Sequence, residues 1–327
     1  MTILVTGGAG YIGSHLVLDL CERGETVWVL DDLSTGRRAL LPPQVRLIEG
    51  DVGDAALLAR VFEEAAIDTV LHFAGSIIVP ESHADPLKYY RNNTAASRTL
   101  IEACVAAGIR RFIFSSTAAV YGNPAEVPIS EAAAQQPISP YGASKMMTEL
   151  MLRDVGAAHG LASICLRYFN VAGADPKGRS GQCSPQATHL IKVAAQAALG
   201  LRPRLEIFGT DYPTPDGTCV RDYIHVTDLA RAHALALDHL RDGGESAVLN
   251  CGYGTGFSVR EVIQAVRRVH GASFDVVESP RRPGDPAQLV ADPAEIRARL
   301  GWRPDLDDLD TIVAQALDWE RRLGEAA

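Results

Sequence analysis

The start of the chain joins a short apolar run to a helical pattern through a glycine-rich turn. Thr2–Thr6 reads TILVT, and GGAGYIGSHLVLDL follows it. Gly7, Gly10 and Gly13 fit the pattern G-x-x-G-x-x-G. Glycine permits the tight turn, lets the backbone approach a diphosphate and lets the helix pack closely on the strand. The turn therefore predicts a parallel α/β fold with a dinucleotide at the start of its first helix.

Acidic and small residues follow the next strand candidates. Asp31 and Asp32 end the second apolar run. A carboxylate there accepts hydrogen bonds from an adenosine ribose and repels a 2′-phosphate, which favours NAD over NADP. The alternative for Asp31 is a helix N-cap or a solvated turn carboxylate. Ligands collect where parallel strands end, so the predicted cofactor site also includes residues at two later strand ends. These are Asp51 and Val52, near the adenine, and Phe73, Ala74 and Gly75, where small residues let the cofactor pass close to the backbone.

Strand and helix patterns alternate through the first half of the chain. Near-continuous apolar strands between helices predict a doubly wound parallel sheet covered on both faces. The predicted strands are Thr2–Thr6, Thr26–Leu30, Val45–Glu49, Asp68–Phe73, Arg111–Ser116 and Ala162–Tyr168, and helices are predicted to begin near Tyr11, Asp54, Asp85 and Ser139.

The pattern changes after about residue 170, where loops become rich in Gly, Pro and Asp. We predict a cofactor-binding domain over 1–170 and a smaller C-terminal α/β substrate domain over 171–327, with a soft boundary because later segments often return to the first domain. Helices are predicted near Ala187, Val226, Ser258, Asp292 and Leu309, and short strands near Leu205, Ala247 and Phe274.

The composition excludes several classes of partner. The 327 residues carry a formal net charge of −9 and no basic run, so a nucleic-acid partner is not expected. No apolar run is long enough for a membrane span, and the start lacks the basic region of a secretory signal. The six cysteines are scattered without a C-x-x-C pair, which predicts reduced thiols in a cytoplasmic protein and no metal site.

The stretch SPYGASK places a phenol and an ammonium on one face of a predicted helix. Tyr141 and Lys145 are four positions apart, about one helical turn. A tyrosine, with a pKa of about 10, needs a stabilised phenolate to act as a base near neutral pH. Lys145 supplies one cation and an oxidised nicotinamide a second. Thr117, in FSSTAAVYG, is placed to pass a proton between substrate and phenolate. The alternative is an accidental surface spacing.

The motifs TGGAGYIGSH, FSSTAAVYG and YGASK resemble the extended short-chain dehydrogenase/reductase family. LDDLSTG, GDV, HFAG, YYRNN, LRYFNVAGADP, IFGTDYPTPDGTCVRDYIHVTDLA and RRPGDPA follow in order across nearly the whole chain. Together they are similar to the branch of that family that epimerises UDP-hexoses at C4. The resemblance implies a Rossmann fold for the first domain, a UDP-sugar site in the second and tightly held NAD.

The resemblance also assigns roles. Tyr141 is implied to take the proton from the sugar 4-hydroxyl while hydride passes to NAD, with Lys145 as its electrostatic partner and Thr117 as the bridging hydroxyl, where the family more often has serine. The 4-keto sugar then turns over, and hydride returns to its opposite face. UDP-glucose and UDP-galactose are the implied substrates. Further implied cofactor contacts are Tyr11, Ile12, Asn92 and Tyr168.

The implied substrate contacts come mainly from the second half of the chain. Guanidinium forks suit diphosphate oxygens. One departure is His189, where some members have asparagine; another is Leu289, where some carry a bulky tyrosine, so an N-acetyl group should fit and UDP-N-acetylglucosamine should be partly accepted. The contacts are Arg221 and Arg282 for the diphosphate, Asn170 for a phosphate, Asp285 for the ribose, Phe208 for the uracil, and His189, Leu190, Tyr223 and Leu289.

Other activities are weighed against this one. A 4,6-dehydratase needs an acid and a base after the hydroxyl of Thr117, but Ala118 and Ala119 occupy those positions. A 4-epimerase for a uronic acid or pentose nucleotide differs mainly at C5 and stays open. A regulator that senses NAD without chemistry would not need Tyr141 and Lys145. The resemblance further implies a homodimer through the helices near Asp85–Ala106 and Ser139–His159.

Overall fold

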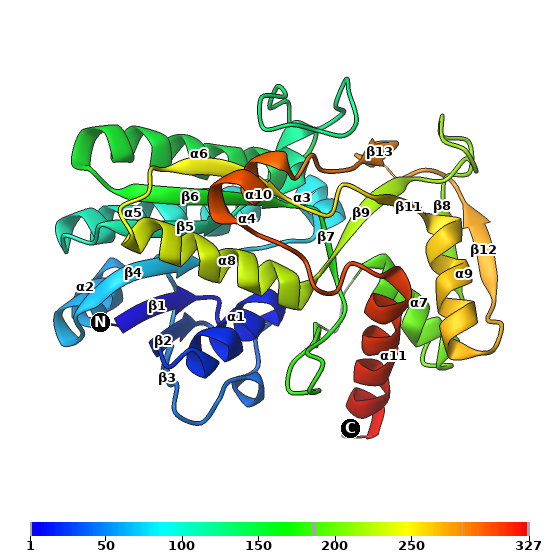
Figure 1. Ribbon diagram of the computed structural model, residues 1–327, viewed down its shortest axis with the longest axis horizontal. Coiled ribbons are helices and arrows are strands. Elements are labelled where there is room, and N and C mark those ends of the chain that lie inside the picture. The colour runs from blue at the N-terminus through cyan, green and yellow to red at the C-terminus, as the bar shows by residue number, and fades with distance from the viewer. Residues whose placement is uncertain (1, 185–187, 283, 326–327) are drawn as a thin grey trace.

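The largest element is a parallel sheet of seven strands (Figure 1), and the computed structural model describes residues 2–184, 188–282 and 284–325. The strand order is β10-β6-β5-β4-β1-β2-β3, so the order reverses between β1 and β4. The doubly wound sheet predicted from the sequence is confirmed. The strands are β1 (Thr2–Thr6), β2 (Thr26–Asp31), β3 (Arg46–Glu49), β4 (Ile67–His72), β5 (Arg111–Ser115), β6 (Ala162–Tyr168) and β10 (Ala247–Cys251).

Helices cover both faces of this sheet because alternate strand residues are buried on opposite sides. In β1, Ile3 and Val5 belong to one apolar cluster and Leu4 to another. Against the first cluster pack α1 (Tyr11–Glu22) and α8 (Val226–Arg241), and against the second pack α2 (Ala55–Glu64), α5 (Ala96–Ala106) and α6 (Pro140–His159). Both α8 and β10 come from beyond residue 170 yet lie on this sheet (Figure 1).

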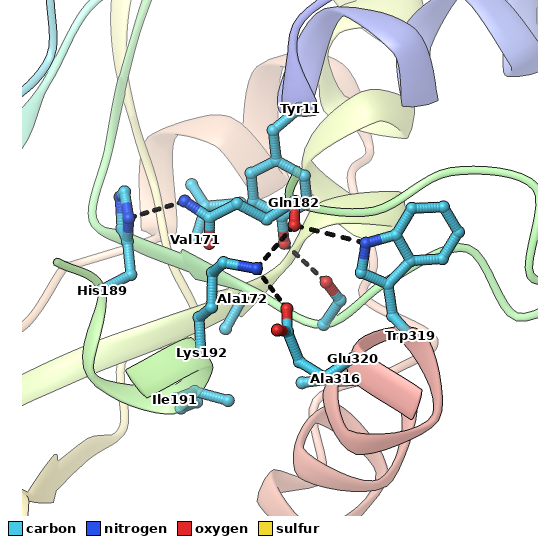
Figure 2. A pocket seen from close by; sticks show the side chains of 11 residues that line it. Tyr11, Val171, Ala172, Gln182, His189, Ile191, Lys192, Ala316, Trp319 and Glu320 are labelled. Atoms are coloured by element: carbon cyan, nitrogen blue, oxygen red, sulfur yellow. Dashed lines mark hydrogen bonds and ion pairs between the residues drawn. The ribbon is translucent and has the colours of Figure 1, made fainter. Parts of the chain in front are cut away.

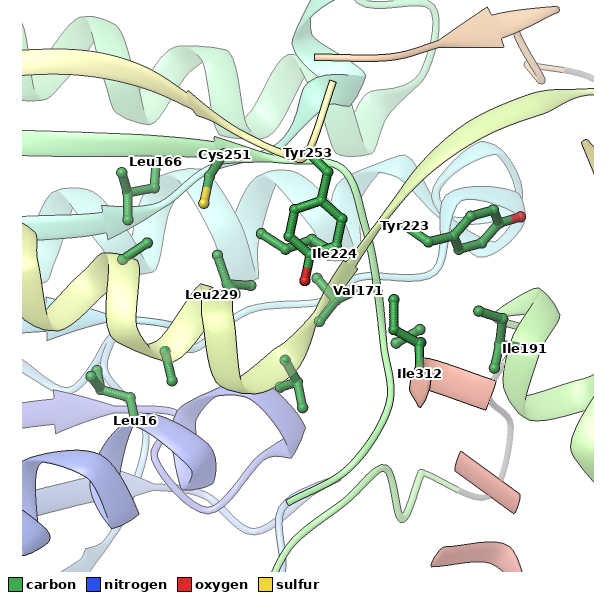
Figure 3. Packing of buried hydrophobic residues seen from close by; sticks show 14 of the residues in the cluster. Leu16, Leu166, Val171, Ile191, Tyr223, Ile224, Leu229, Cys251, Tyr253 and Ile312 are labelled. Carbon is green, nitrogen blue, oxygen red and sulfur yellow. The ribbon is translucent and has the colours of Figure 1, made fainter. Parts of the chain in front are cut away.

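A smaller part of the fold lies beyond the carboxyl ends of the strands. Its apolar residues continue the first cluster without a break, from Leu16 and Leu229 through Ile224 and Val171 to Ile312 (Figure 3). One strand set is β7 (Asn170–Ala172), β9 (Val220–His225), β11 (Gly256–Ser258) and β13 (Gln288–Leu289), and β8 (Leu205–Phe208) pairs with β12 (Val276–Ser279); the helices are α7 (Leu190–Ala198), α9 (Val259–His270) and α11 (Leu309–Glu325). Another late helix, α10 (Ala294–Leu300), packs against β10 and α8 of the large sheet.

Polar caps explain several helix starts that the sequence predicts. The side chain of Asp54 accepts from the first turn of α2, Ser139 accepts from Gly142 N–H in α6, and Ser258 forms a capping box with Glu261 in α9. These side chains satisfy N–H groups that have no partner within the helix.

Some predicted elements differ from the structure. The single helix expected from Asp85 is instead divided into α4 (Pro86–Tyr89), the π-helical turn η2 (Tyr90–Ala95) and α5, and α3 (Val79–Ala84) precedes it. The predicted start near Ala187 lies outside the described residues, and α7 begins at Leu190. The short strands β7, β9, β11 and β13 were missed because they form only by pairing with one another. The 3₁₀ turns are η1 (Arg38–Leu40) and η3 (Ala118–Tyr121).

We expect part of the stability to be lost in mild acid because of His233 on α8. Its side chain is fully buried between Ser115 Oγ (3.1 Å from Nε2) and the Leu229 carbonyl (2.9 Å from Nδ1). Burial lowers its pKa to about 4. The unfolded chain takes up the proton first, so about 3 kcal/mol of stability is present above pH ~6.5 and is lost as the pH falls towards ~4. Denaturant unfolding at several pH values checks this, and a His233→Gln variant should show a flatter acid slope; an unchanged slope would contradict the assignment.

Candidate functional site

The glycine turn packs against the end of β4 at the point where the strand order reverses. Gly7 has φ +69°, and a Cβ added to it would lie 2.5 Å from the Ala74 backbone nitrogen. A Cβ on Gly13 would lie 2.3 Å from the Gly7 carbonyl oxygen. Gly10 is the N-cap of α1 and has no side chain to satisfy the first N–H groups. Close backbone approach and free N–H groups are what a diphosphate requires, so the residues present fit NAD.

Asp31 supports this turn directly. Its carboxylate is buried and accepts hydrogen bonds from Ala9 N–H and Leu33 N–H, both at 2.9 Å. Burial raises the pKa of Asp31, and the two N–H donors partly offset the effect. Asp31 thus closes a turn, but it is buried and caps no helix, so it is neither the solvated turn carboxylate nor the N-cap of the alternative interpretation. A ribose would use the remaining lone pairs of the same oxygens.

The other predicted contacts near the adenine end are more open. Asp32 is exposed and accepts from Ser34 N–H at 2.9 Å. Asp51 is exposed and accepts from Gly53 N–H at 2.7 Å. Val52 is buried in the apolar cluster beneath α2. Ile12 packs on the opposite cluster. Of these four side chains only the two carboxylates carry polar atoms, and both already close local turns. Ile12 can contribute only through its backbone N–H in the first turn of α1.

The loop after β4 is held by an asparagine that the sequence analysis missed. Asn93 is buried; its Oδ1 accepts from Ser76 N–H at 2.7 Å, and its Nδ2 donates to the Ser76 carbonyl at 3.0 Å. The predicted contact Asn92 donates to Ser76 Oγ at 3.1 Å. A Cβ on Gly75 would lie 3.9 Å from Lys145 Nζ. The loop therefore passes next to the lysine, and the second asparagine of YYRNN was the available signal.

Tyr141 and Lys145 lie one helical turn apart on α6, as their spacing predicts, and both are buried. Thr117, two residues after β5, is also buried and contacts the Tyr141 phenol. Burial raises the pKa of Tyr141, and the contact with Thr117 acts in the opposite direction. Lys145 Nζ donates to the Ser115 carbonyl at 3.0 Å. Burial lowers the pKa of Lys145 to about 8, and Glu149 opposes that change. The phenol needs further positive charge before it can act as a base.

An aromatic wall completes the site on the side of β6. The rings of Phe73 and His233 are 4.7 Å apart between centroids, and Tyr168 lies 6.4 Å from His233. Ser115 Oγ contacts both His233 and Tyr168. Burial raises the pKa of Tyr168, so its phenol stays neutral.

Four of the predicted substrate residues converge beyond the strand ends. Arg282 donates from Nε to Asp285 at 3.0 Å, and Arg221 lies 3.8 Å from the same carboxylate. The guanidinium of Arg282 also covers one face of the Phe208 ring at 4.6 Å. A base packing on Phe208 must use the other face or displace Arg282. Two guanidinium groups beside one carboxylate suit a ribose next to a diphosphate.

The remaining substrate predictions line the strands next to this cluster. Tyr223 on β9 is buried; burial raises its pKa, while Arg221 and Arg282 act in the opposite direction and show that the charges lie close. Asn170 of β7 pairs with Tyr223, and Leu289 of β13 pairs with Arg221. Leu289 is buried among apolar residues next to Val120 and Phe169 in the same cluster.

His189 contacts a polar cluster that joins α7 to α11 (Figure 2). Gln182 donates from Nε2 to Nδ1 of His189 at 2.8 Å. Lys192 Nζ donates to the Gln182 carbonyl at 2.8 Å and pairs with Glu320. Burial, followed by the nearby Lys192 charge, lowers the pKa of His189 to about 4, so the imidazole is neutral. Gln182, Lys192 and Glu320 were not found from the sequence, because they are separated by up to 138 positions.

The same cluster borders the cofactor site. Tyr11 lines a small cavity together with His189 and Trp319, and its hydroxyl donates to the Gly173 carbonyl at 2.7 Å. Leu190 packs on the main apolar cluster beside it. The start of α1 is therefore tied to the loop that leads from β7 to α7.

Two features are absent from the described parts of the chain, residues 2–184, 188–282 and 284–325. In these ranges no group of His, Cys, Asp or Glu side chains is arranged to hold a metal ion. Within the same ranges, none of the helices has both the length and the apolar character to span a bilayer.

Comparison with known proteins agrees with this geometry. The NAD dependent epimerase/dehydratase family matches residues 3–252. A UDP-glucose 4-epimerase of Azospirillum brasilense is 62% identical over 324 residues, 99% of this chain and 93% of the relative. The solved UDP-glucose 4-epimerase of Brucella ovis in complex with NAD has a TM-score of 0.94 and 47% identity, covering 97% of both chains.

One further solved structure bears on the sugar. The UDP-Glc/GlcNAc 4-epimerase of Campylobacter jejuni is also 47% identical, with a TM-score of 0.86 over 98% of this chain and 99% of that chain. These matches span nearly the full length at identities well above 30%. The chain therefore belongs to the NAD dependent epimerase/dehydratase family, part of the extended short-chain dehydrogenases/reductases.

Proposed function

We propose that the protein interconverts UDP-glucose and UDP-galactose by NAD-dependent epimerisation at sugar C4. The observation that carries the proposal is the buried contact between Thr117 and Tyr141 one turn before Lys145, beside the Ala74–Ser76 loop. Bound NAD would take hydride from C4 and return it to the opposite face of the sugar. The match to UDP-glucose 4-epimerases at up to 62% identity supports the same activity.

The protein's own residues carry the proton. Tyr141 removes the proton of the 4-hydroxyl once a positive charge next to its ring offsets burial, and Thr117 relays it when the hydroxyl is out of direct reach. Lys145, held by the Ser115 carbonyl, supplies an ammonium one helical turn from Tyr141. We assign the diphosphate to Arg221 and Arg282, the ribose to Asp285 and a phosphate contact to Asn170. Anchoring at the nucleotide leaves the keto sugar free to turn over.

An assay with no added cofactor tests this proposal. Purified protein given UDP-galactose alone should form UDP-glucose, measured with a coupling dehydrogenase. Heat-denatured protein should release NAD into the supernatant. Protein that carries NAD but converts neither sugar would contradict the activity while leaving the cofactor assignment in place. UDP-glucuronic acid and UDP-arabinose in the same assay test the alternative 4-epimerases.

Leu289 leads us to propose that acetylated sugars are accepted as well. A leucine is smaller than the tyrosine it replaces in some relatives, and the similar Campylobacter jejuni enzyme is named for both UDP-Glc and UDP-GlcNAc. We expect Leu289→Tyr to lower kcat/KM for UDP-N-acetylglucosamine by about tenfold or more, and for UDP-glucose by less, because steric exclusion of a small group is worth about 1–3 kcal/mol. Equal losses on both sugars would contradict this role.

We also propose a cytoplasmic homodimer formed through α5 and α6. Met147 and Leu150, three positions apart on one face of α6, are apolar and are 38% and 36% exposed. All six cysteines are free, as expected in a reducing compartment. Sedimentation equilibrium should give twice the chain mass, and Met147→Glu with Leu150→Glu should give monomers. We also propose that residues 1–170 form the domain that binds NAD and that residues 171–327 form the domain that binds the UDP-sugar.

A further inference from the structure

Glu149 continues the line of Tyr141 and Lys145 along one buried face of α6. It is 5% exposed, one helical turn beyond Lys145, and the proposed reaction gives it no role. Its carboxylate forms a two-point ion pair with Arg167 of β6, with Nε at 3.0 Å from Oε1 and Nη2 at 2.6 Å from Oε2. A buried carboxylate two helical turns beyond the reacting tyrosine and one turn beyond its lysine partner requires a physical explanation.

Three elements of the site meet at this carboxylate. Ser116, which lies between Ser115 and Thr117 at the end of β5, donates its hydroxyl to Glu149. Arg167 comes immediately before Tyr168 on β6. The carboxylate therefore links α6 to the two strand ends that carry the lysine's carbonyl acceptor, the bridging hydroxyl and the aromatic wall.

The ion pair is fully satisfied by hydrogen bonds. Arg167 donates from Nη1 to the Tyr121 hydroxyl at 2.9 Å, and that hydroxyl donates to Asn250 Oδ1 at 2.7 Å. Gln135 donates to the second oxygen of Glu149 at 2.7 Å. A well-packed apolar pair is often as stable as a buried ion pair, so stability alone does not account for these charges. They are better explained by what they do to neighbouring groups.

We infer that Glu149, anchored by Arg167, is a positioning residue that holds the Lys145 ammonium and the Ser115–Thr117 strand end in place for proton transfer by Tyr141. The inference rests on the proposed epimerase function. The structural feature that carries it is the hydrogen-bonded link that Glu149 makes from α6 to β6 and to the end of β5. No contact of Glu149 with substrate or cofactor is required.

The electrostatics around Lys145 agree with this role. Burial lowers the pKa of Lys145 to about 8, and Glu149 is the group that raises it. Facing Lys145 from the other elements are the Ser115 carbonyl and Phe114 ring of β5, and His72 of β4, which is neutral because burial and the lysine lower its pKa to about 3. Removal of the Glu149 charge should let the lysine lose its proton nearer neutral pH and leave the phenol harder to ionise.

The experiment compares Glu149→Gln with the wild-type holoenzyme. We expect kcat to fall by about tenfold for each unit by which the pKa of the Tyr141 phenol rises, with KM nearly unchanged. The alkaline limb of the kcat profile should move to lower pH. The tyrosinate absorbance assigned to Tyr141, by difference from Tyr141→Phe, should move to higher pH. That absorbance is read without turnover, so it separates failure of this inference from failure of the proposed function, which would show as no sugar conversion by the wild type.

Two further variants keep the test decisive. Glu149→Gln leaves Arg167 buried without its partner and can prevent folding, whereas Glu149→Leu with Arg167→Met removes both charges and should fold. The double variant should show the same direction of tyrosinate shift. Leu152→Ala, a buried apolar change on the same helix, should lower stability yet leave the tyrosinate titration unchanged. The inference would be overturned if Tyr141 in the folded Glu149 variants titrated at the same pH as in the wild type, or if Leu152→Ala shifted that titration by the same amount.

Discussion

Replacement of Tyr141 by phenylalanine is expected to lower kcat by about two to four powers of ten, the usual contribution of a positioned general base. The ring stays in its buried slot, so packing is retained and only the ionisable oxygen is lost. Water cannot substitute easily, because Tyr141 and Thr117 are both buried. The measurement is the coupled UDP-galactose assay under saturating substrate, with circular dichroism and NAD release confirming that fold and cofactor are intact.

The neighbouring hydroxyl provides the matched control. Thr117→Ser keeps the hydroxyl that contacts Tyr141 and should leave kcat within about a few-fold, whereas Thr117→Val removes that hydroxyl, leaves the phenol without this polar partner and should lower kcat. KM for the nucleotide sugar should change little in all three variants, because the diphosphate contacts that we propose lie on β9 and on the loop at Arg282. Turnover by Tyr141→Phe at the wild-type rate would remove Tyr141 from the mechanism.

Replacement of Lys192 by methionine is expected to destabilise the protein by about 3–5 kcal/mol, the cost of leaving one member of a buried ion pair without its partner. Lys192 and Glu320 are 7% and 4% exposed in their side chains, and Lys192 also holds the Gln182 carbonyl at 2.8 Å. Denaturant unfolding followed by tryptophan fluorescence measures the loss, since Trp319 lies in the same cluster (Figure 2).

The double variant Lys192→Met with Glu320→Leu separates charge from packing. It removes both ions at once and should recover most of the lost stability, because an apolar pair of similar volume is often neutral or stabilising at such a site. KM for the UDP-sugar should be higher than that of the wild type in both variants. Without Lys192, Gln182 loses the hydrogen bond to its carbonyl and no longer orients His189. A single variant as stable as the wild type would show that water reaches Glu320 in solution.

Features that depend on near neighbours in the chain could be predicted from the sequence. The glycines at positions 7, 10 and 13 permit a tight turn between a strand and a helix that side chains would block, and the structure has this turn. The i, i+4 spacing of Tyr141 and Lys145 places both on one face of α6 whatever surrounds the helix. Helix caps such as Ser139 act within three residues.

Features that depend on distant pairings could not be predicted in the same way. Asn93, the Glu149–Arg167 pair and the Lys192–Glu320 pair each depend on elements that meet only after the chain has folded. A lone glutamate or lysine in a helical pattern looks the same in sequence whether it faces water or a buried partner. The short strands of the smaller part could not be predicted for the same reason, since β9 has no partner strand close to it in the chain.

The amino-acid sequence by itself determined the parallel sheet, the dinucleotide turn and the identity of the phenol and the ammonium, because local sterics and helical periodicity act over a few residues. Only the tertiary structure decided the electrostatic setting of those groups: which carboxylate faces Lys145, how far the Tyr141 phenol is removed from water, and which loops are held by buried ion pairs. Charge interactions and desolvation depend on distance in space and on the surrounding dielectric, and both arise only when segments far apart in the chain are packed together.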